Sequence, residues 1–114
     1  MFKGLFVIKY DQCTTYEVKI YIAGPIDVAE QICRREFFKE GWCCTINPTK
    51  YIYTGGDEIG YVIGIINYAR FPSLHEKILE RSLEFAELLM KETYQKSCSV
   101  VATDKAYFLS NELK

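Results

Sequence analysis

The side chains best suited to hold a ligand gather in one short stretch, residues 67–72, with the sequence Asn-Tyr-Ala-Arg-Phe-Pro. Phe71 can stack on a planar base, and Arg70 can bind a phosphate through two parallel hydrogen bonds. Asn67 can hydrogen-bond a base edge or a ribose hydroxyl. The stretch therefore predicts a site for a planar, anionic, hydroxylated ligand such as a nucleotide. The same composition is equally compatible with a strand-to-helix junction that exposes Arg70 and buries Phe71.

The turn that follows Tyr53 is a second place where an anion could bind. Consecutive backbone N–H groups from Thr54 to Asp57 can converge on a phosphate, and the Tyr53 ring could stack on a base. The turn is shorter than a P-loop and lacks the P-loop lysine. A β-hairpin turn with Gly55 and Gly56 explains the same residues without a ligand.

A third group of candidates, Thr103, Asp104 and Lys105, offers a hydroxyl, a carboxylate and an ammonium at the end of an expected strand. Lys105 could bind a phosphate, and Thr103 could bind a ribose or a base. The alternative interpretation is an ordinary polar turn, for which Asp and Lys are common residues.

Residues that could carry catalysis are sparse. The single histidine, His75, has no GxSxG or HxE pattern near it that would supply a nucleophile or an orienting partner. Five cysteines occur at positions 13, 33, 43, 44 and 98 without a CxxC pair, so the spacing of a zinc site is absent. We therefore expect no catalytic residue, no metal and no cofactor, and a protein that binds rather than an enzyme.

Charge and composition narrow the class of partner. The formal net charge is −1, with 14 Lys and Arg scattered among 15 Asp and Glu, so the basic stripe that nucleic-acid polymers require is missing. No apolar run reaches the ~18–20 residues that span a bilayer, and the first residues lack the features of a signal peptide. Unpaired thiols then indicate a reduced, cytoplasmic protein with a single domain over residues 1–114. Aromatic residues make up 15% of the chain, which fits oligomer interfaces, base-stacking pockets or simply a Tyr-rich sheet surface.

The periodicity of the chain predicts an α+β domain. Strands are expected at residues 2–9, 15–23, 42–53, 59–68 and 97–103, with a possible short last strand at 106–109. Helices are expected at residues 27–40 and from 73 to about 95, each begun by a capping box, Asp27 with Glu30 and Ser73 with Glu76. The resulting order, ββαββαβ, favours a mainly antiparallel sheet with both helices packed on one face.

Three residues inside the expected strands carry further information. Pro48 cannot donate to a sheet ladder, so it predicts an edge position or a bulge. Gly60 and Gly64 weaken a strand, and their presence predicts a bulge or a surface that another group approaches closely.

The order of three segments resembles a known family of small viral proteins. The segments are KGLFVI at residues 3–8, YIYTGGDEIGYVIGIINYARFP at 51–72 and QKSCSVVATDKA at 95–106. Together they resemble the type-one Thoeris anti-defence proteins, which sequester the cyclic ADP-ribose signal of bacterial TIR-domain enzymes. The resemblance implies a non-enzymatic sponge that holds the intact signal in pockets between subunits, in a dimer or a ring of dimers, in the host cytoplasm. Related sponges also hold cyclic oligonucleotides at separate sites.

Two other functions remain open at this point. The chain could be an interaction module or inhibitor that binds a partner protein through a Tyr-rich sheet face. A third, weaker hypothesis is an enzyme that acts on nucleotides.

Overall fold

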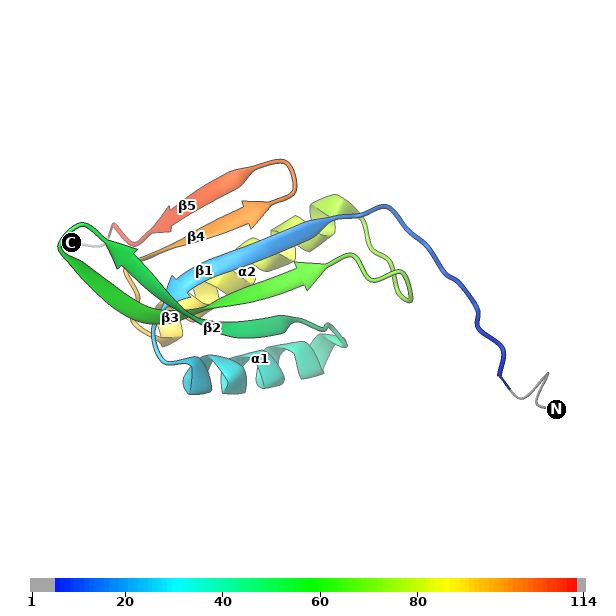
Figure 1. Ribbon diagram of the computed structural model, residues 1–114, viewed down its shortest axis with the longest axis horizontal. Helices are drawn as coiled ribbons and strands as arrows, with labels where there is room; N and C mark the ends of the chain where they lie inside the picture. Colours follow the sequence, from blue (N-terminus) through cyan, green and yellow to red (C-terminus); the bar gives the residue numbers. More distant parts are fainter. Residues whose placement is uncertain (1–5, 113–114) are drawn as a thin grey trace.

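The computed structural model describes residues 6–112, apart from the side chain of residue 38, and shows two helices packed on one five-stranded sheet (Figure 1). The elements in chain order are β1 (Glu17–Ala23), α1 (Ile26–Glu40), β2 (Thr45–Tyr53), β3 (Gly56–Ile66), α2 (His75–Glu92), β4 (Ser97–Ala102) and β5 (Ala106–Ser110). The α+β class and the mainly antiparallel sheet are confirmed. The possible short last strand is also present, as β5.

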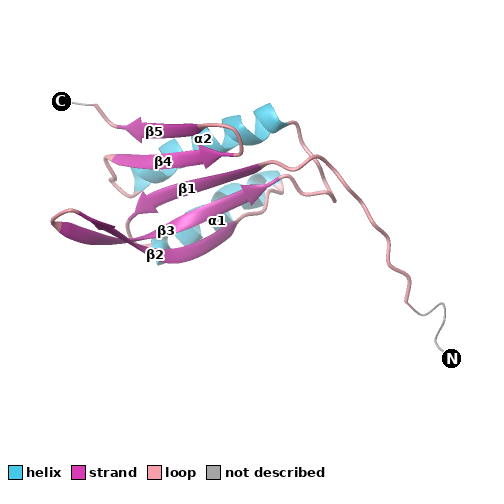
Figure 2. Cartoon of the chain, turned by 45° about the horizontal axis from the view of Figure 1, so that its top comes forward, coloured by secondary structure: helices cyan, strands magenta, loops and turns pink. Residues whose placement is uncertain are grey.

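The sheet has the strand order β2-β3-β1-β4-β5, and every neighbouring pair is antiparallel. Strand β1 is therefore central, with the β2–β3 hairpin on one side and the β4–β5 hairpin on the other. Figure 2 shows the sheet in front of both helices, so the helices cover one face and leave the other open. Pro48 lies in the edge strand β2, as its missing N–H predicts.

The core forms between the sheet and the helices because the side chains of β1 alternate strictly between a buried and a solvent-facing side. Val18 and Ile20 are fully buried and Ile22 nearly so, whereas Glu17 and Lys19 point to the open face. The remaining buried apolar residues are Tyr16, which directly precedes β1, and residues of both helices, β3 and β4: Ala29, Ile32, Cys33, Tyr61, Ile63, Ile65, Ile78, Phe85, Ala86, Leu89, Met90, Cys98, Val100 and Ala102. Neither helix in the described residues is long and apolar enough to cross a membrane.

The predicted capping boxes are wrong. Helix α1 begins after Pro25 and α2 after Leu74, and neither N-terminus receives a side-chain hydrogen bond. Ser73 instead donates its backbone N–H to Asn67 Oδ1 at 2.9 Å, which ties it to the end of β3 and leaves Leu74 to begin the helix. The predicted end of α1 is confirmed, because Gly41 adopts the left-handed conformation there at φ 67°.

The strand predicted at residues 2–9 does not form in the part that the structure describes; residues 2–5 lie outside the described residues. Residues 6–10, which we call the arm, belong to neither sheet nor helix and run away from the body (Figure 1). Phe6, Val7 and Ile8 are 81%, 79% and 60% exposed. Their β propensity is high, but no strand of the same chain pairs with them.

The two glycines of β3 lie under side chains of the neighbouring strand. A Cβ at Gly60 would lie 2.5 Å from the Ile22 carbonyl oxygen and 2.5 Å from the Tyr51 ring, while one at Gly64 would lie 2.6 Å from Thr45 Oγ1. The close approach predicted from the sequence therefore comes from within the sheet. Tyr51 is fixed over Gly60 by a 2.7 Å hydrogen bond from its hydroxyl to the Tyr61 carbonyl oxygen.

We predict that Gly60→Ala destabilises the protein by about 1–3 kcal/mol, because the new methyl group would collide with backbone that cannot move aside. Gly64→Ala is the matched control and should cost less, since a Thr45 side chain can rotate away. Urea unfolding followed by circular dichroism measures both. Equal losses in the two variants would contradict the explanation.

Candidate functional site

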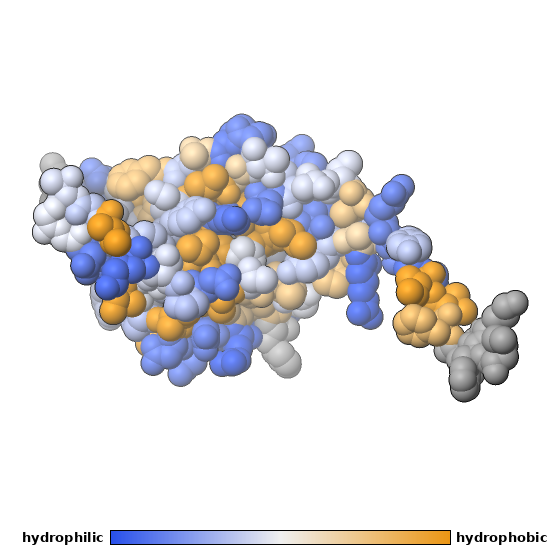
Figure 3. Space-filling model, viewed as in Figure 1, coloured by the Kyte–Doolittle hydropathy of each residue, from blue (hydrophilic) through white to orange (hydrophobic). Residues whose placement is uncertain are grey.

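The open face of the sheet is a broad surface that no element of the described chain covers (Figure 2). One row across it runs Asn47, Val62, Tyr21, Ser99 and Phe108, because these residues are register partners on successive strands. Phe108 is 72% exposed, and Figure 3 shows apolar residues gathered in the middle of the visible face among hydrophilic ones. A face with this mixture can bind a ligand that has an apolar ring and charged groups, or a second protein surface.

Two shallow hollows lie on this face, one on each side of β1. The first has a volume of about 380 Å³ and lies toward β4, where Glu17, Val101 and Thr103 line it. The second has a volume of about 270 Å³ and lies toward β2, where Asn47, Val62 and Gly64 line it. Lys19 and Tyr21 border both hollows. The absence of a side chain at Gly64 helps to open the second hollow.

The polar and aromatic side chains that line the two hollows supply complementary chemistry. Lys19 Nζ lies 3.4 Å from Glu17 Oε1, and both side chains are about half exposed, so each can exchange this weak pair for a ligand group. Tyr21 offers an aromatic ring, and Asn47 lies on the same cross-sheet row, roughly 10 Å away at the usual spacing of strands. One ammonium, one carboxylate, one ring and one amide can therefore contact a single zwitterionic ligand that carries a base.

A network of polar groups lies at the end of the sheet where β1 begins. The buried Tyr16 donates its hydroxyl to Asp104 Oδ1 at 3.5 Å, and its ring stacks on His75 with centroids 4.6 Å apart. His75 Nε2 lies 2.8 Å from Thr14 Oγ1. Burial, and then the negative charge of Asp104, raises the pKa of Tyr16 above its ordinary value. The phenol therefore stays protonated near neutral pH, and its hydroxyl hydrogen is held by the Asp104 carboxylate.

Three of the eight predicted ligand-binding residues lie around this end of β1. The Asn67 side chain connects two segments, since its Nδ2 donates to the Thr14 carbonyl oxygen and its Oδ1 accepts from Ser73. Thr103 Oγ1 accepts from the Glu17 N–H at 2.8 Å, which extends the contact between β1 and β4. Asp104 contacts Tyr16. The polar groups of Asn67 and Thr103 are thus used to hold the chain together.

The other candidates do not converge with these three. Phe71 is 48% exposed and stacks on Tyr68, and Arg70 is exposed and forms no ion pair with any described residue. Lys105 accepts a backbone hydrogen bond from Ala102 in the β4–β5 turn. Tyr53 and Thr54 lie at the far tip of the β2–β3 hairpin. Since β3 has 11 residues, this tip is roughly 33 Å from the end of β3 at the usual rise per residue. One chain therefore cannot bring all eight residues to one ligand, and a role for Tyr53 and Thr54 would need a second subunit.

Sequence reasoning missed four of the side chains that line the hollows, Glu17, Lys19, Tyr21 and Asn47. The alternation of β1 separated Glu17, Lys19 and Tyr21 from the buried residues but also fits plain solvated surface. Sequence reasoning lacked the strand order. Only a central position of β1 places these three side chains between two hollows of the open face.

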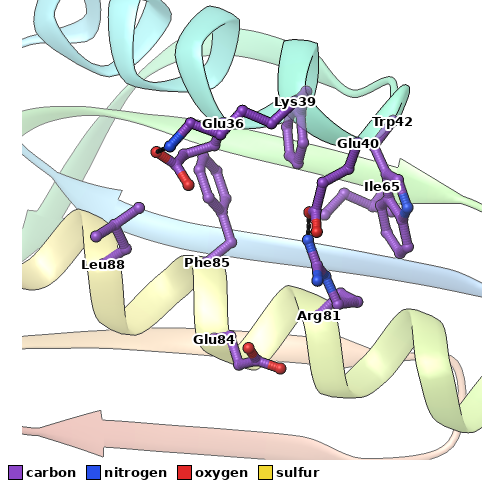
Figure 4. Close-up of a pocket in the computed structure, with 10 residues that line it drawn as sticks. Glu36, Lys39, Glu40, Trp42, Ile65, Arg81, Glu84, Phe85 and Leu88 are labelled. Carbon is purple, nitrogen blue, oxygen red and sulfur yellow. Dashed lines mark hydrogen bonds and ion pairs between the residues drawn. The ribbon is translucent and has the colours of Figure 1, made fainter.

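A third hollow, the interhelical groove, lies between α1 and α2 and has a volume of about 360 Å³ (Figure 4). Phe37, Trp42 and Phe85 form its aromatic part. Arg81 pairs with Glu40 across it and lies over the Trp42 ring, with its guanidinium carbon 5.7 Å from the ring centroid. Both cations that line the groove, Lys39 and Arg81, are already paired with glutamates of α1, so neither is left free for an anionic ligand. We therefore interpret the groove as the seam that joins the helices rather than as the ligand site.

A second ion pair joins the same two helices. Arg35 on α1 binds Glu92 on α2 through two hydrogen bonds of 3.0 and 2.5 Å. The pKa of Glu92 is lowered chiefly by this pairing.

Comparisons with known proteins identify the fold. No protein-family model matches the sequence, and no curated protein matches it as a relative. Two solved structures share the fold with a TM-score of 0.70. A phage SAM lyase in its apo state is 13% identical over 87% of this chain and 91% of the lyase. A phage SAM lyase in complex with S-methyl-5'-thioadenosine is 11% identical over 96% of this chain and 99% of the lyase.

These structures correct the expectation that the chain is not an enzyme, because both proteins that share its fold are named as lyases. At 11–13% identity the likeness establishes the fold. Both neighbours are phage proteins, in keeping with the viral character of the family that the sequence resembles, and one of them holds a small adenosine-containing ligand. None of these comparisons finds a Thoeris protein.

We predict that Asp104→Asn lowers the pKa of Tyr16 toward its ordinary value, because the carboxylate no longer raises it and only burial and the nearby Tyr107 still do. Titration of ¹³Cζ-labelled tyrosine by nuclear magnetic resonance measures this pKa, with Tyr16→Phe to assign the signal. Asp27→Asn on α1 serves as the charge-matched control and should leave Tyr16 unchanged. A Tyr16 pKa that is the same in Asp104→Asn and in the unaltered protein would show that the carboxylate does not act on the phenol.

Proposed function

We propose that this chain binds S-adenosylmethionine (SAM) on the open face of its sheet and cleaves it to S-methyl-5'-thioadenosine. The observation that carries the proposal is the pair of hollows that share Lys19 and Tyr21, on a fold with the architecture of phage SAM lyases. SAM has an adenine for an aromatic ring and a methionyl end with one ammonium and one carboxylate. These groups match the side chains around the hollows.

In the proposed complex, Tyr21 stacks on the adenine and Asn47 hydrogen-bonds its edge. Glu17 binds the methionyl ammonium, and Lys19 holds one carboxylate oxygen while leaving the other free. Glu17 and Lys19 are two residues apart on one face of β1, about 7 Å along the strand, so they can hold one amino-acid group between them.

The reaction needs little chemical equipment from the protein. The substrate's own carboxylate oxygen attacks the γ-carbon, a C–O bond forms and the C–S bond breaks. The electron pair of that bond goes to the sulfonium sulfur, which becomes the neutral thioether of S-methyl-5'-thioadenosine. The other product is a five-membered lactone. The reaction consumes no water and requires no metal or protein nucleophile, which agrees with the small number of candidate catalytic residues in the sequence.

The medium around the reacting atoms matters more than an acid or a base. A carboxylate and a sulfonium neutralise each other in this step, and opposite charges attract more strongly where water is excluded. Val62 and Val101 supply apolar surface in the hollows, but each hollow is open to solvent on one side. We therefore propose a homo-oligomer in which the open face of a second copy closes the site. The exposed Phe108 and Ile66 on the same face favour such a contact.

The cyclic ADP-ribose ligand implied by the sequence resemblance shares an adenosine with SAM but carries a pyrophosphate. Lys19 is the single cation that lines the two hollows, and Glu17 lies beside it. This charge pattern fits a zwitterion better than a dianion, so SAM is the preferred ligand. The anti-defence role is retained as part of the proposal: the phage neighbours support a protein that removes a small host metabolite during infection.

Incubation of the purified chain with SAM, followed by liquid chromatography and mass spectrometry, tests the proposal. We expect equimolar S-methyl-5'-thioadenosine and lactone. Tyr21→Ala should weaken binding of S-methyl-5'-thioadenosine by about 5-fold or more, because a stacked base contributes about 1–3 kcal/mol. Lys19→Ala should slow SAM cleavage and leave S-methyl-5'-thioadenosine binding nearly unchanged, since that product lacks the carboxylate.

Tyr94→Ala and Lys50→Ala serve as matched controls, because Tyr94 is 92% exposed after α2 and Lys50 is exposed on the edge strand β2. Both should behave like the unaltered protein. Stoichiometric binding of cyclic ADP-ribose with no turnover of SAM would overturn the proposal.

A further inference from the structure

The outer edge of β5 is an unprotected strand edge. In the described chain, β5 is the last strand of the sheet. The Ala102 N–H donates to the Lys105 carbonyl oxygen, and the Asn111 N–H donates to the Lys96 carbonyl oxygen. These two hydrogen bonds fix which residues of β5 pair their backbone groups with β4. Ala106, Phe108 and Ser110 must then direct their N–H and C=O groups outward. The sequence of β5 contains neither proline nor charge, whereas the opposite edge strand, β2, contains Pro48 and a lysine.

A large groove borders this edge on the helix side. It has a volume of about 640 Å³ and lies between α2 and β5. Leu83 and Met90 of α2 and Tyr107 and Leu109 of β5 contribute its apolar lining. A sixth strand beside β5 would place every second side chain over this groove.

The arm has the composition and length of such a strand. Residues 6–10 are Phe-Val-Ile-Lys-Tyr, five residues beside the five of β5. In an extended chain Phe6, Ile8 and Tyr10 share one face, and Val7 and Lys9 share the other. Figure 3 shows apolar residues on the arm, well away from the body. Tyr10 is 91% exposed, so the arm leaves a row of large apolar side chains in water.

The arm is directed away from the β5 edge of its own chain. The Asn67 side chain holds the Thr14 carbonyl oxygen at 2.9 Å, His75 contacts the Thr14 hydroxyl at 2.8 Å, and Cys13 Sγ contacts the Asn67 carbonyl oxygen at 3.5 Å. Asn67 follows β3, on the side of β1 opposite to β4 and β5. These contacts fix the root of the arm on the β3 side, and Figure 1 shows the arm continuing away from β5.

We propose that the arm of one copy adds to the β5 edge of a second copy as a sixth strand. Phe6, Ile8 and Tyr10 fill the groove between α2 and β5 of the second copy, and Val7 packs beside its Phe108. The outward backbone groups of β5 pair with the arm, and Lys9 stays in solvent on the open face. This contact uses no ligand and is independent of SAM binding.

Hydrogen–deuterium exchange of the full chain without ligand tests the backbone pairing. We expect alternate amides within residues 6–10, those whose N–H groups point toward β5, to exchange about 10-fold or more slowly at high protein concentration than at a dilution that yields monomers by native mass spectrometry. Phe108→Pro removes an outward N–H and should abolish this protection, whereas Phe108→Ala loses the same ring but keeps the N–H and should retain it. Equal protection in the two variants, or protection that does not depend on concentration, would overturn the proposal.

A second experiment tests which copy holds the arm and does not need the proline variant to fold. A photo-crosslinking residue is placed at position 8, and light chains are mixed with chains labelled with heavy isotopes before irradiation. Crosslinks between light and heavy peptides that join the arm to α2 or β5 are expected. Crosslinks within single chains only, or to other segments only, would contradict an exchanged arm.

Discussion

One-sided burial of the central strand β1 governs the rest of this molecule. Val18, Ile20 and Ile22 lose contact with water under the helices, and the pleat of the strand then forces Glu17, Lys19 and Tyr21 to the opposite face. Because β1 lies between two hairpins, these side chains stand in the middle of the open face rather than at an edge. The interaction that builds the core thus also places a charged pair and an aromatic ring where two hollows meet.

The same sheet illustrates why a glycine-bearing strand need not indicate a ligand. Gly60 and Gly64 accommodate Tyr51 and Thr45 of the neighbouring strand, so their first role is packing. The hollow beside Gly64 follows from that packing. Similarly, Asn67 has the chemistry of a ligand-binding residue, but its amide joins Thr14 to Ser73 and so fixes both the root of the arm and the entry to α2.

The absence of a recognisable catalytic motif is a weak argument against enzymatic activity for this kind of chemistry. A motif marks a protein group that must attack, or a metal that must be held. A sulfonium substrate carries its own leaving group and its own nucleophile, so the protein has only to orient them and exclude water. Neighbours named as lyases share this fold, which overturns the expectation of a pure binder.

The sequence by itself determined the α+β class, both helices and the two faces of β1, because each depends on local periodicity, and it restricted Pro48 to an edge strand or a bulge through a single missing N–H. Only the tertiary structure decided the strand order, the distance between Tyr53 and Asn67, and the side of the sheet that stays open. It also decided that the strand-like residues 6–10 pair with no strand in the described part of their own chain. Strand pairing joins residues far apart in sequence, and a strand's propensity does not say which edge it will meet.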